Sequence, residues 1–349
     1  TPLGKGAMGM VYTAHDRMLE EAVANKVLRA EFANTPEMAQ RFRHEIKLAR
    51  KVSHRNVCRI HEYGEDSGMR YISMEFVEGV DLRQLARERG GLIPVEEAFD
   101  LAIQLSEGLQ AIHDVGIVHR DLKMSNIMRD NRGLVRLMDF GIAKAAGADR
   151  TGGGLTTTGQ IMGTPEYMSP EQCLGDKTDH RSDLYSLGIV TYEMFTGQVP
   201  FRGDTPVATL FKHIQDPVPF EGPVAARIPL PAVAVLRRAL DKDRAARFDN
   251  AAAMAEALRD AQLTAASTDP EDVQPTAGMP AVAPPEPGPP TPTPSDRRRV
   301  TRLDIFVNFV LRREGTLGTV LQEERTIAEN VGRGGARVMT TMSSLALGD

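Results

Sequence analysis

A dense polar cluster at residues 119–126, reading HRDLKMSN, restricts what this chain can fold into more than any other feature. It follows residues 94–112, where apolar side chains recur at the three- and four-residue spacing of an amphipathic helix. Thirteen residues beyond Asn126 comes a second cluster, DFG, whose aspartate is Asp139. Asp121, Asn126 and Asp139 carry oxygen atoms of the kind that bind Mg²⁺ and orient a hydroxyl group. The spacing therefore predicts a loop-borne site for a Mg²⁺-nucleotide.

The bulk properties exclude several classes of protein. At 349 residues the chain is long enough for two or more domains. A formal net charge of −5 gives no electrostatic basis for non-specific nucleic-acid binding, so no nucleic-acid partner is predicted. Cys58 and Cys173 form neither a disulfide framework nor a metal-ligand spacing, which favours a reducing, cytoplasmic location. No run reaches the ~18 apolar residues of a membrane span. Because the chain opens on Thr1 inside a motif, we expect a fragment with a truncated first strand.

The first motif is rich in glycine: residues 3–12 read LGKGAMGMVY, a G-x-G-x-x-G-x-V pattern. Glycine lets the backbone approach a phosphate closely and adopt positive φ. A dinucleotide fingerprint would open a helix at this point. Here strand-like residues 11–14 follow instead, then a polar turn and a second strand at residues 22–28. The pattern predicts a hairpin lid over a nucleotide, with a plain glycine-rich turn as the alternative.

Lys26 lies in the second of these strands, and strand alternation places Ala24 on the same face. A small residue beside a lysine leaves room for a flat base whose phosphates the ammonium group reaches. A helix over residues 35–52 begins with threonine and proline, and Glu45 falls on its apolar stripe. Because a carboxylate on an apolar face is costly unless paired, Lys26 is its predicted partner. The alternatives are a lysine that snorkels from a strand edge and a glutamate exposed beside the stripe.

Hydrophobic periodicity and turn residues predict the other elements. We expect strands at residues 57–63 and 69–76 joined by a turn at 64–68, a hairpin at 126–129 and 134–138, and further helices at 81–89, 183–196, 232–239 and 250–263. Residues 145–163 are rich in glycine and threonine and include Thr156, Thr157 and Thr158. They fit a disordered surface loop, or a regulated loop whose threonines gain phosphate and dock on a basic group.

The composition changes abruptly after Leu263, because ten of the 22 prolines lie between Pro270 and Pro294. Residues 264–297 are therefore predicted to form an extended, disordered linker without a core. Residues 298–349 have strand-like patches at 302–311 and 338–341, too little apolar material for an independent barrel.

In identity, order and spacing these motifs closely resemble the protein-kinase superfamily, specifically the bacterial eukaryotic-like Ser/Thr kinases. The resemblance covers residues 1–263 and implies an α+β, two-lobed kinase fold, with a β-rich N-lobe, a helical C-lobe and ATP between them. The Pro-rich linker and a partial β-rich tail follow it. The implied enzyme is a non-specific serine/threonine protein kinase of signal transduction. It would transfer the ATP γ-phosphoryl group to protein Ser/Thr hydroxyls with Mg²⁺ or Mn²⁺.

The resemblance also gives individual residues a role. Asp121 would orient the substrate hydroxyl and accept its proton, and Asn126 and Asp139 would bind the metal ions. Lys26 would hold the α- and β-phosphates and pair with Glu45. The other nucleotide-binding positions are the glycine loop, the gatekeeper, the two hinge residues and the walls of the adenine pocket: Leu3, Gly4, Lys5, Gly6, Ala7, Met8, Gly9, Met10, Val11, Ala24, Met74, Glu75, Val77 and Met128.

Further positions bear on acceptor type and regulation. Lys123, counted among the catalytic residues, and Thr164 match the Ser/Thr type of kinase rather than the tyrosine type. Arg120, directly before the catalytic aspartate, implies control by loop phosphorylation at Thr156 and Thr158. A kinase homodimer would carry out that phosphorylation in trans.

Two supporting contacts and two departures complete the resemblance. Glu171 is expected to pair with Arg247 as a structural ion pair, and Asp183 to brace the backbone of the catalytic loop. Asn25 stands where the family usually has Ile or Val. Because it faces away from the nucleotide, we expect a stability cost rather than inactivity. Arg55 replaces the usual proline at a position outside the catalytic set.

The tail resembles a PilZ domain in two motifs, Arg298-x-x-x-Arg302 and residues 330–335, reading NVGRGG. In that family the arginines grip the phosphates and guanines of cyclic di-GMP. Here Gly332 stands at the usual serine position, and about half of a PilZ barrel is present. The alternative is a basic, glycine-rich tail that binds no dinucleotide.

Two other functions remain open at this point. A pseudokinase scaffold would signal by binding alone, but all four polar catalytic positions, Lys26, Asp121, Asn126 and Asp139, are intact. A small-molecule phosphotransferase of kinase-like fold is disfavoured by the long threonine loop.

Overall fold

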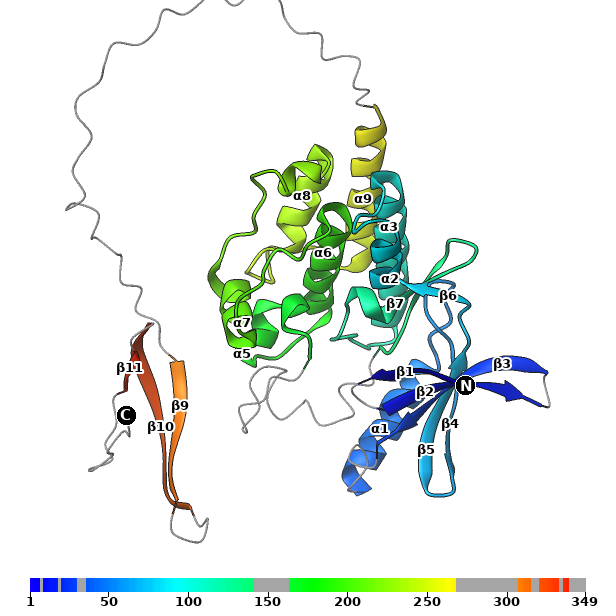
Figure 1. Cartoon of the computed structure of the whole chain (residues 1–349), viewed down its shortest axis with the longest axis horizontal. Helices are drawn as coiled ribbons and strands as arrows, with labels where there is room; N and C mark the ends of the chain where they lie inside the picture. Colours follow the sequence, from blue (N-terminus) through cyan, green and yellow to red (C-terminus); the bar gives the residue numbers. More distant parts are fainter. Residues whose placement is uncertain are drawn as a thin grey trace, which may run out of the picture. The chain divides into compact units, whose positions relative to one another are not determined.

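A computed structural model describes residues 1–6, 9–17, 20–29, 36–140, 163–267, 307–314, 320–332 and 335–338 (Figure 1). The chain divides into two compact units, Thr1–Gln274 and Pro275–Asp349. Within the described residues, no helix has both the length and the apolar content that crossing a membrane requires.

The first unit begins with a five-stranded antiparallel sheet in the order β1-β2-β3-β5-β4. Its strands are β1 (Pro2–Gly6), β2 (Gly9–Asp16), β3 (Glu21–Leu28), β4 (Ile60–Asp66) and β5 (Met69–Glu75). The predicted strand–glycine loop–strand hairpin is therefore confirmed, whereas its role as a nucleotide lid remains a prediction. Gly9 is required here for a steric reason, because a Cβ at this position would lie 1.8 Å from the carbonyl oxygen of Val27.

Helix α1 (Pro36–Ala49) packs on this sheet through the predicted apolar stripe. Phe42 and Ala49 are buried, and the Phe42 ring meets Tyr63 of β4 edge to face at 5.5 Å between centroids. Packing of this stripe therefore fixes α1 against β4. Because Glu45 lies on α1, the same packing also sets the position of Glu45.

The connection between β4 and β5 is tighter than predicted. The expected five-residue turn at residues 64–68 is wrong, because β4 continues to Asp66. Ser67 and Gly68 have φ values of 50° and 75°. Two successive residues with positive φ are typical of a two-residue type I′ hairpin turn, whose twist matches that of the strands.

The rest of this unit is mainly helical. Its helices are α2 (Leu82–Glu88), α3 (Val95–Asp114), α5 (Pro170–Leu174), α6 (His180–Thr196), α7 (Pro206–Gln215), α8 (Leu230–Ala239) and α9 (Ala251–Ser267). Helix α3 packs against α6 and α9, and Figure 1 shows the three side by side. A small sheet of β6 (Gly79–Asp81), β7 (Ile127–Asp130) and β8 (Val135–Leu137) lies beside α3.

Several helices differ from the sequence-based expectation, among them the five-residue helix α5, which was not predicted. Helix α7 was not predicted, although Thr205 caps it and Pro206 occupies its first turn, the same signal that marked the start of α1. Helix α9 ends at Ser267, past the predicted domain boundary at Leu263, and Ala265 still packs on the core. The predicted boundaries at residues 263 and 297 otherwise remain predictions.

The second unit contains a three-stranded antiparallel sheet of β9 (Val307–Glu314), β10 (Val320–Gly332) and β11 (Gly335–Val338). Strand β10 was not predicted. Strands β9 and β11 overlap the two expected patches. Residues 264–267 of the predicted linker are helical, in α9, which corrects that part of the prediction. Residues 268–297 and the predicted dinucleotide ligands Arg298 and Arg302 lie outside the described residues.

Candidate active site

The loop at residues 119–126 connects α3 to β7, and a buried carboxylate of α6 holds its backbone. Asp183 accepts hydrogen bonds from the amide of His119 at 2.7 Å and from the amide of Arg120 at 2.8 Å. Its Oδ2 also lies 2.8 Å from Nε2 of His113 in α3. Arg120 has a φ of 66°, a conformation that costs energy for a non-glycine residue. The bracing role predicted for Asp183 is confirmed by these contacts.

The charge state of Asp183 follows from its partners. Burial alone would raise the pKa of this carboxyl group. The hydrogen bond and charge of His113, the charge of His119 and the Arg120 amide outweigh burial and hold the pKa below its ordinary value. Asp183 is therefore ionised more readily than an ordinary aspartate, and it supports the backbone of the loop as a charged acceptor.

Asp121, in the loop that Asp183 supports, is the centre of a set of polar contacts. Lys123 Nζ lies 2.7 Å from Asp121 Oδ2 and 3.0 Å from Thr164 Oγ1. Asn126 donates from Nδ2 to the Asp121 carbonyl oxygen at 2.8 Å and to its Oδ2 at 3.0 Å. One Asp121 oxygen thus accepts two donors, Lys123 Nζ and Asn126 Nδ2.

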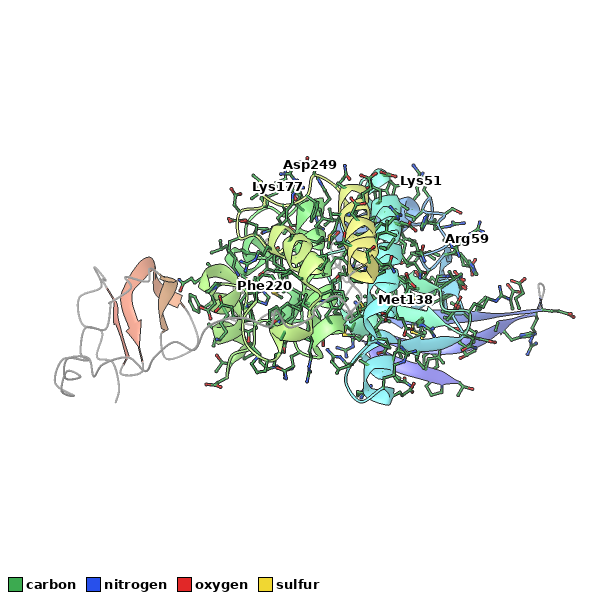
Figure 2. The ribbon with its side chains drawn as sticks, turned by 90° about the horizontal axis from the view of Figure 1, so that it is seen from above. Lys51, Arg59, Met138, Lys177, Phe220 and Asp249 are labelled. Atoms are coloured by element: carbon green, nitrogen blue, oxygen red, sulfur yellow. The ribbon has the colours of Figure 1, made fainter. Side chains whose placement is uncertain are left out.

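A second carboxylate is brought to the site by the β7–β8 hairpin. The Met138 amide donates to the carbonyl oxygen of Asn126 at 2.9 Å, so the residue after it, Asp139, lies next to the end of the loop. Lys26 Nζ from β3 lies 2.8 Å from Asp139 Oδ1. The Lys26 side chain is 4% exposed and that of Asp139 34% exposed. Figure 2 labels Met138 near the boundary between the sheet and the helices.

This arrangement joins a buried ammonium group, two carboxylates and a carboxamide from the two halves of the first unit. Carboxylate and amide oxygens are hard ligands of the kind that Mg²⁺ takes, and lysine is a common phosphate binder. No group of three or more His, Cys, Asp or Glu residues suited to a metal ion occurs among the described residues. Asn126 and Asp139 would leave the other Mg²⁺ positions to phosphate oxygens and water.

The strand register places the predicted adenine-pocket residues side by side. Val11 pairs with Lys26 across β2 and β3, and Ala24 pairs with Met74 across β3 and β5. Ala24 and Met74 are buried, so they can form a wall beside the lysine. Met128 lies in β7 of the small sheet.

The remaining predicted positions are placed as follows. Leu3 and Gly4 lie in β1 with Lys5 and Gly6, Met10 follows Gly9 in β2, Glu75 ends β5, and Val77 lies between β5 and β6. Ala7, Met8, Thr156 and Thr158 lie outside the described residues. Glu45 is half-buried on α1, and its predicted pairing with Lys26 remains a prediction.

A comparison with protein-family models decides the family. Residues 1–259 match the protein kinase domain. The chain belongs to the protein kinase family. The two-lobed kinase fold expected from the motifs is therefore confirmed, with β1–β5 and α1 in the N-lobe and α2–α9 in the C-lobe.

Named kinases are similar over the same region. The chain is 40% identical over 249 residues to the probable serine/threonine-protein kinase CPE1738 of Clostridium perfringens, covering 71% of this chain and 36% of that protein. It is 41% identical over 261 residues to the probable serine/threonine-protein kinase PknB of Corynebacterium glutamicum, covering 72% and 40%. The chain thus spans well under half the length of these curated relatives.

A solved structure agrees with the fold. The crystal structure of the Mycobacterium tuberculosis PknI kinase domain superposes with a TM-score of 0.57 at 27% identity, covering 74% of this chain and 93% of that chain.

Contacts in the C-lobe support the kinase site from a distance. Arg247 is almost completely buried and makes two 2.8 Å contacts with the Glu171 carboxylate, which confirms the predicted ion pair. Gln172, whose importance was not predicted, donates to the Arg120 carbonyl oxygen at 3.0 Å. It also closes a capping box with Ser169, and the S-x-x-Q spacing is the sequence signal that would have marked it.

Proposed function

We propose that this kinase domain transfers the γ-phosphoryl group of ATP to Ser or Thr hydroxyls of protein substrates. The observation that carries the proposal is the position of Lys123, whose ammonium group bridges Asp121 and Thr164. This places a cation beside the proposed base, next to the segment that starts at Gly163. The names of the two relatives, both serine/threonine-protein kinases, support the same acceptor type.

In the proposed reaction each residue has a defined task. Asp121 orients the substrate hydroxyl and accepts its proton, while Lys123 neutralises charge at the acceptor. Lys26 binds phosphate oxygens, and Asn126 and Asp139 hold Mg²⁺ or Mn²⁺. The metal-bound ATP supplies the phosphoryl group. Because this transfer depends mainly on positioning and electrostatics, we expect removal of any of these groups to be severe.

The other functions are less well supported. A pseudokinase scaffold would not need an intact set of Lys26, Asp121, Asn126 and Asp139, and neither the contacts among these residues nor the named relatives favour it. The family match also disfavours a small-molecule phosphotransferase.

We further propose that loop phosphorylation regulates the enzyme. Arg120 lies next to Asp121, and its backbone is held by Asp183 and Gln172. A phosphate on Thr156 or Thr158 would add nearly two negative charges and three acceptor oxygens for such a guanidinium group. A homodimer would allow one copy to phosphorylate the loop of the other.

The activity test is incorporation of label from radiolabelled ATP with Mg²⁺, followed by phosphosite mapping. We expect the full chain to incorporate label on Thr156 or Thr158 and the Asp121→Asn variant to incorporate none above background. Equal incorporation by both proteins would contradict the proposal.

Cyclic di-GMP binding by the tail is a separate proposal with weaker support. The NVGRGG motif coincides with the end of β10 and the start of β11. Calorimetry of the full chain with cyclic di-GMP tests it. Absence of both heat and a thermal shift would end this proposal.

A further inference from the structure

Two neighbouring hollows of 490 Å³ and 430 Å³ open beside the end of strand β5. They share His61, Glu75 and Arg136, so they are two parts of one depression. Neither is lined by the proposed catalytic residues Lys26 or Asp121. The larger hollow includes the proposed hinge residues Glu75 and Val77, whereas most of the smaller hollow is lined by residues with no assigned role in phosphoryl transfer.

The smaller hollow, called the basic hollow below, is dominated by cations. Its lining is Ser53, His54, Arg55, Val57, Arg59, His61, Glu75 and Arg136. With the histidines neutral, three arginines and one glutamate give a formal charge of +2 (three minus one). A concave surface of one sign concentrates ligands of the opposite sign.

The one carboxylate of the basic hollow is already engaged. Glu75 Oε1 lies 3.4 Å from Arg136 Nε, and Glu75 Oε2 accepts the backbone amide of Arg59 at 3.3 Å. Arg136 Nη2 is 3.7 Å from Asp130, whereas its Nη1 is buried without a hydrogen-bond partner. The guanidinium charge of Arg136 is therefore only partly compensated by carboxylates at these distances.

Further donors in the basic hollow are free to meet a ligand. Arg55 and Arg59 are exposed, and neither side chain has a carboxylate within 4 Å among the described residues. The His54 Nδ1 atom accepts the amide of Asn56 at 3.2 Å, so a neutral His54 ring carries its hydrogen on Nε2, where it can donate. Ser53 adds a hydroxyl group.

We propose that the basic hollow binds a phosphate monoester carried by a phosphorylated serine or threonine of a protein. Such a group carries nearly two negative charges and three acceptor oxygens at neutral pH. Guanidinium groups match it with paired, charge-assisted hydrogen bonds. Arg55 and Arg59 supply such donors, and Arg136 adds its charge from a separate chain segment.

The larger hollow indicates what would accompany the phosphate. It is lined by Glu21 and Glu78, both exposed and without a cationic partner among the described residues, together with Phe76 and Val77. This surface favours a lysine or arginine side chain whose stem packs on the apolar residues. The preferred ligand is therefore an extended peptide with a phosphorylated residue a few positions from a basic one.

Fluorescence anisotropy on the full chain, without nucleotide, tests the proposal. The probes are a labelled peptide containing phosphothreonine and lysine, its unphosphorylated form and a form with alanine for lysine. We expect phosphorylation to tighten binding at least about tenfold, the gain from one charge-assisted contact. Arg55→Ala combined with Arg59→Ala should abolish that gain, and Glu78→Ala should abolish the preference for lysine.

Lys51→Ala is the matched control, because Lys51 is an exposed cation of the same segment that lines neither hollow. Figure 2 labels Lys51 and Arg59 on the same flank of the kinase domain. An equal loss in Lys51→Ala, or unchanged binding in the double variant, would overturn the proposal. So would full competition by inorganic phosphate at the peptide's own affinity, which would indicate a site for free phosphate. Because no ATP is used, such results would leave the proposed kinase activity standing.

Discussion

Lys26 Nζ and Asp139 Oδ1 lie 2.8 Å apart, so a side chain of the N-lobe sheet contacts the segment that follows β8 in the C-lobe. The lysine is almost completely buried, whereas the aspartate is one-third exposed. The lysine is thus held in position by a carboxylate that is itself a proposed metal ligand.

Replacing Lys26 by methionine should therefore reduce phosphoryl transfer strongly while leaving the fold intact. We expect a loss of about 10²-fold or more, the scale of removing one group that stabilises developing charge. Initial rates with radiolabelled ATP measure it, and far-UV circular dichroism checks the fold. Lys51→Met, at an exposed lysine, is the control. Rates for Lys26→Met within about twofold of the wild type would refute the role.

Thr164 offers a finer test, because its hydroxyl oxygen lies 3.0 Å from Lys123 Nζ. Thr164→Val keeps the shape but removes this hydrogen bond, so we expect kcat to fall about tenfold or more. Thr164→Ser keeps the hydroxyl group and should retain most of the activity. If Thr164→Val kept the wild-type kcat, the Lys123 contact would have no part in the reaction.

Asn25 should carry a stability cost, as its place in the sequence suggested. Its Oδ1 is buried on β3 without a hydrogen-bond partner. Asn25→Val should therefore raise the free energy of unfolding by about 1–2 kcal/mol, the usual penalty of an unsatisfied buried polar atom. Asn56 Oδ1 is likewise buried without a partner, but Asn56 Nδ2 donates to Gln104 and to the Val135 carbonyl oxygen, so Asn56→Val should lower the free energy of unfolding. Urea titrations followed by circular dichroism suit this tryptophan-free chain.

The stability of the fold should depend far more strongly on the Arg247–Glu171 ion pair than on Asn25. Arg247→Met leaves the buried Glu171 carboxylate unpaired, which typically costs about 3–5 kcal/mol. The double replacement of both residues by methionine should recover much of that loss, since no buried charge then remains. A double variant as unstable as Arg247→Met alone would show that packing, not charge, governs this site.

His213 predicts a dependence of stability on pH. Burial, followed by the charge of Lys242, lowers the pKa of its ring from 6.5 to about 3. Between pH 6.5 and about 3 the His213 ring is therefore protonated in the unfolded chain but neutral in the folded chain. The free energy of unfolding should consequently decrease as pH falls through this range. The slope for one proton is about 1.4 kcal/mol per pH unit.

Urea midpoints measured from pH 7 to pH 5, above the range where carboxylates titrate, would show this effect. His213→Gln should flatten the curve, whereas His15→Gln, at an exposed position, should not. An unchanged slope in His213→Gln would exclude the ring as its source.

Much of the fold and the proposed site was predictable because both depend on local patterns. Alternation identified the face of Lys26, and helical periodicity identified α3 and the stripe of α1. The contact of Lys26 with Asp139 was not predicted, since a pattern in the sequence does not state which of several carboxylates a lysine meets. Helix α7 was not predicted because the Thr-Pro signal for the start of a helix was applied at Thr35-Pro36 but not at Thr205-Pro206.

Long-range features were harder to predict for a physical reason. The basic hollow unites residues that follow α1 with Arg136 of β8, so no window of sequence contains it. The role of Gln172 likewise depends on a contact with Arg120, far away in the chain. The two-residue turn at Ser67 was missed because serine rarely adopts positive φ, and the tight strand pairing imposes it.

The contacts of Asp183 have a consequence for how the enzyme would fail under stress. This side chain of α6 anchors two successive amides of the loop that carries Asp121, and one of these residues has a costly backbone conformation. Once α6 unfolds, the hydrogen bonds that offset the cost of this backbone conformation are lost. We therefore expect phosphoryl transfer and the folded C-lobe to be lost together, so residual turnover along a thermal ramp would report on the integrity of its helical core.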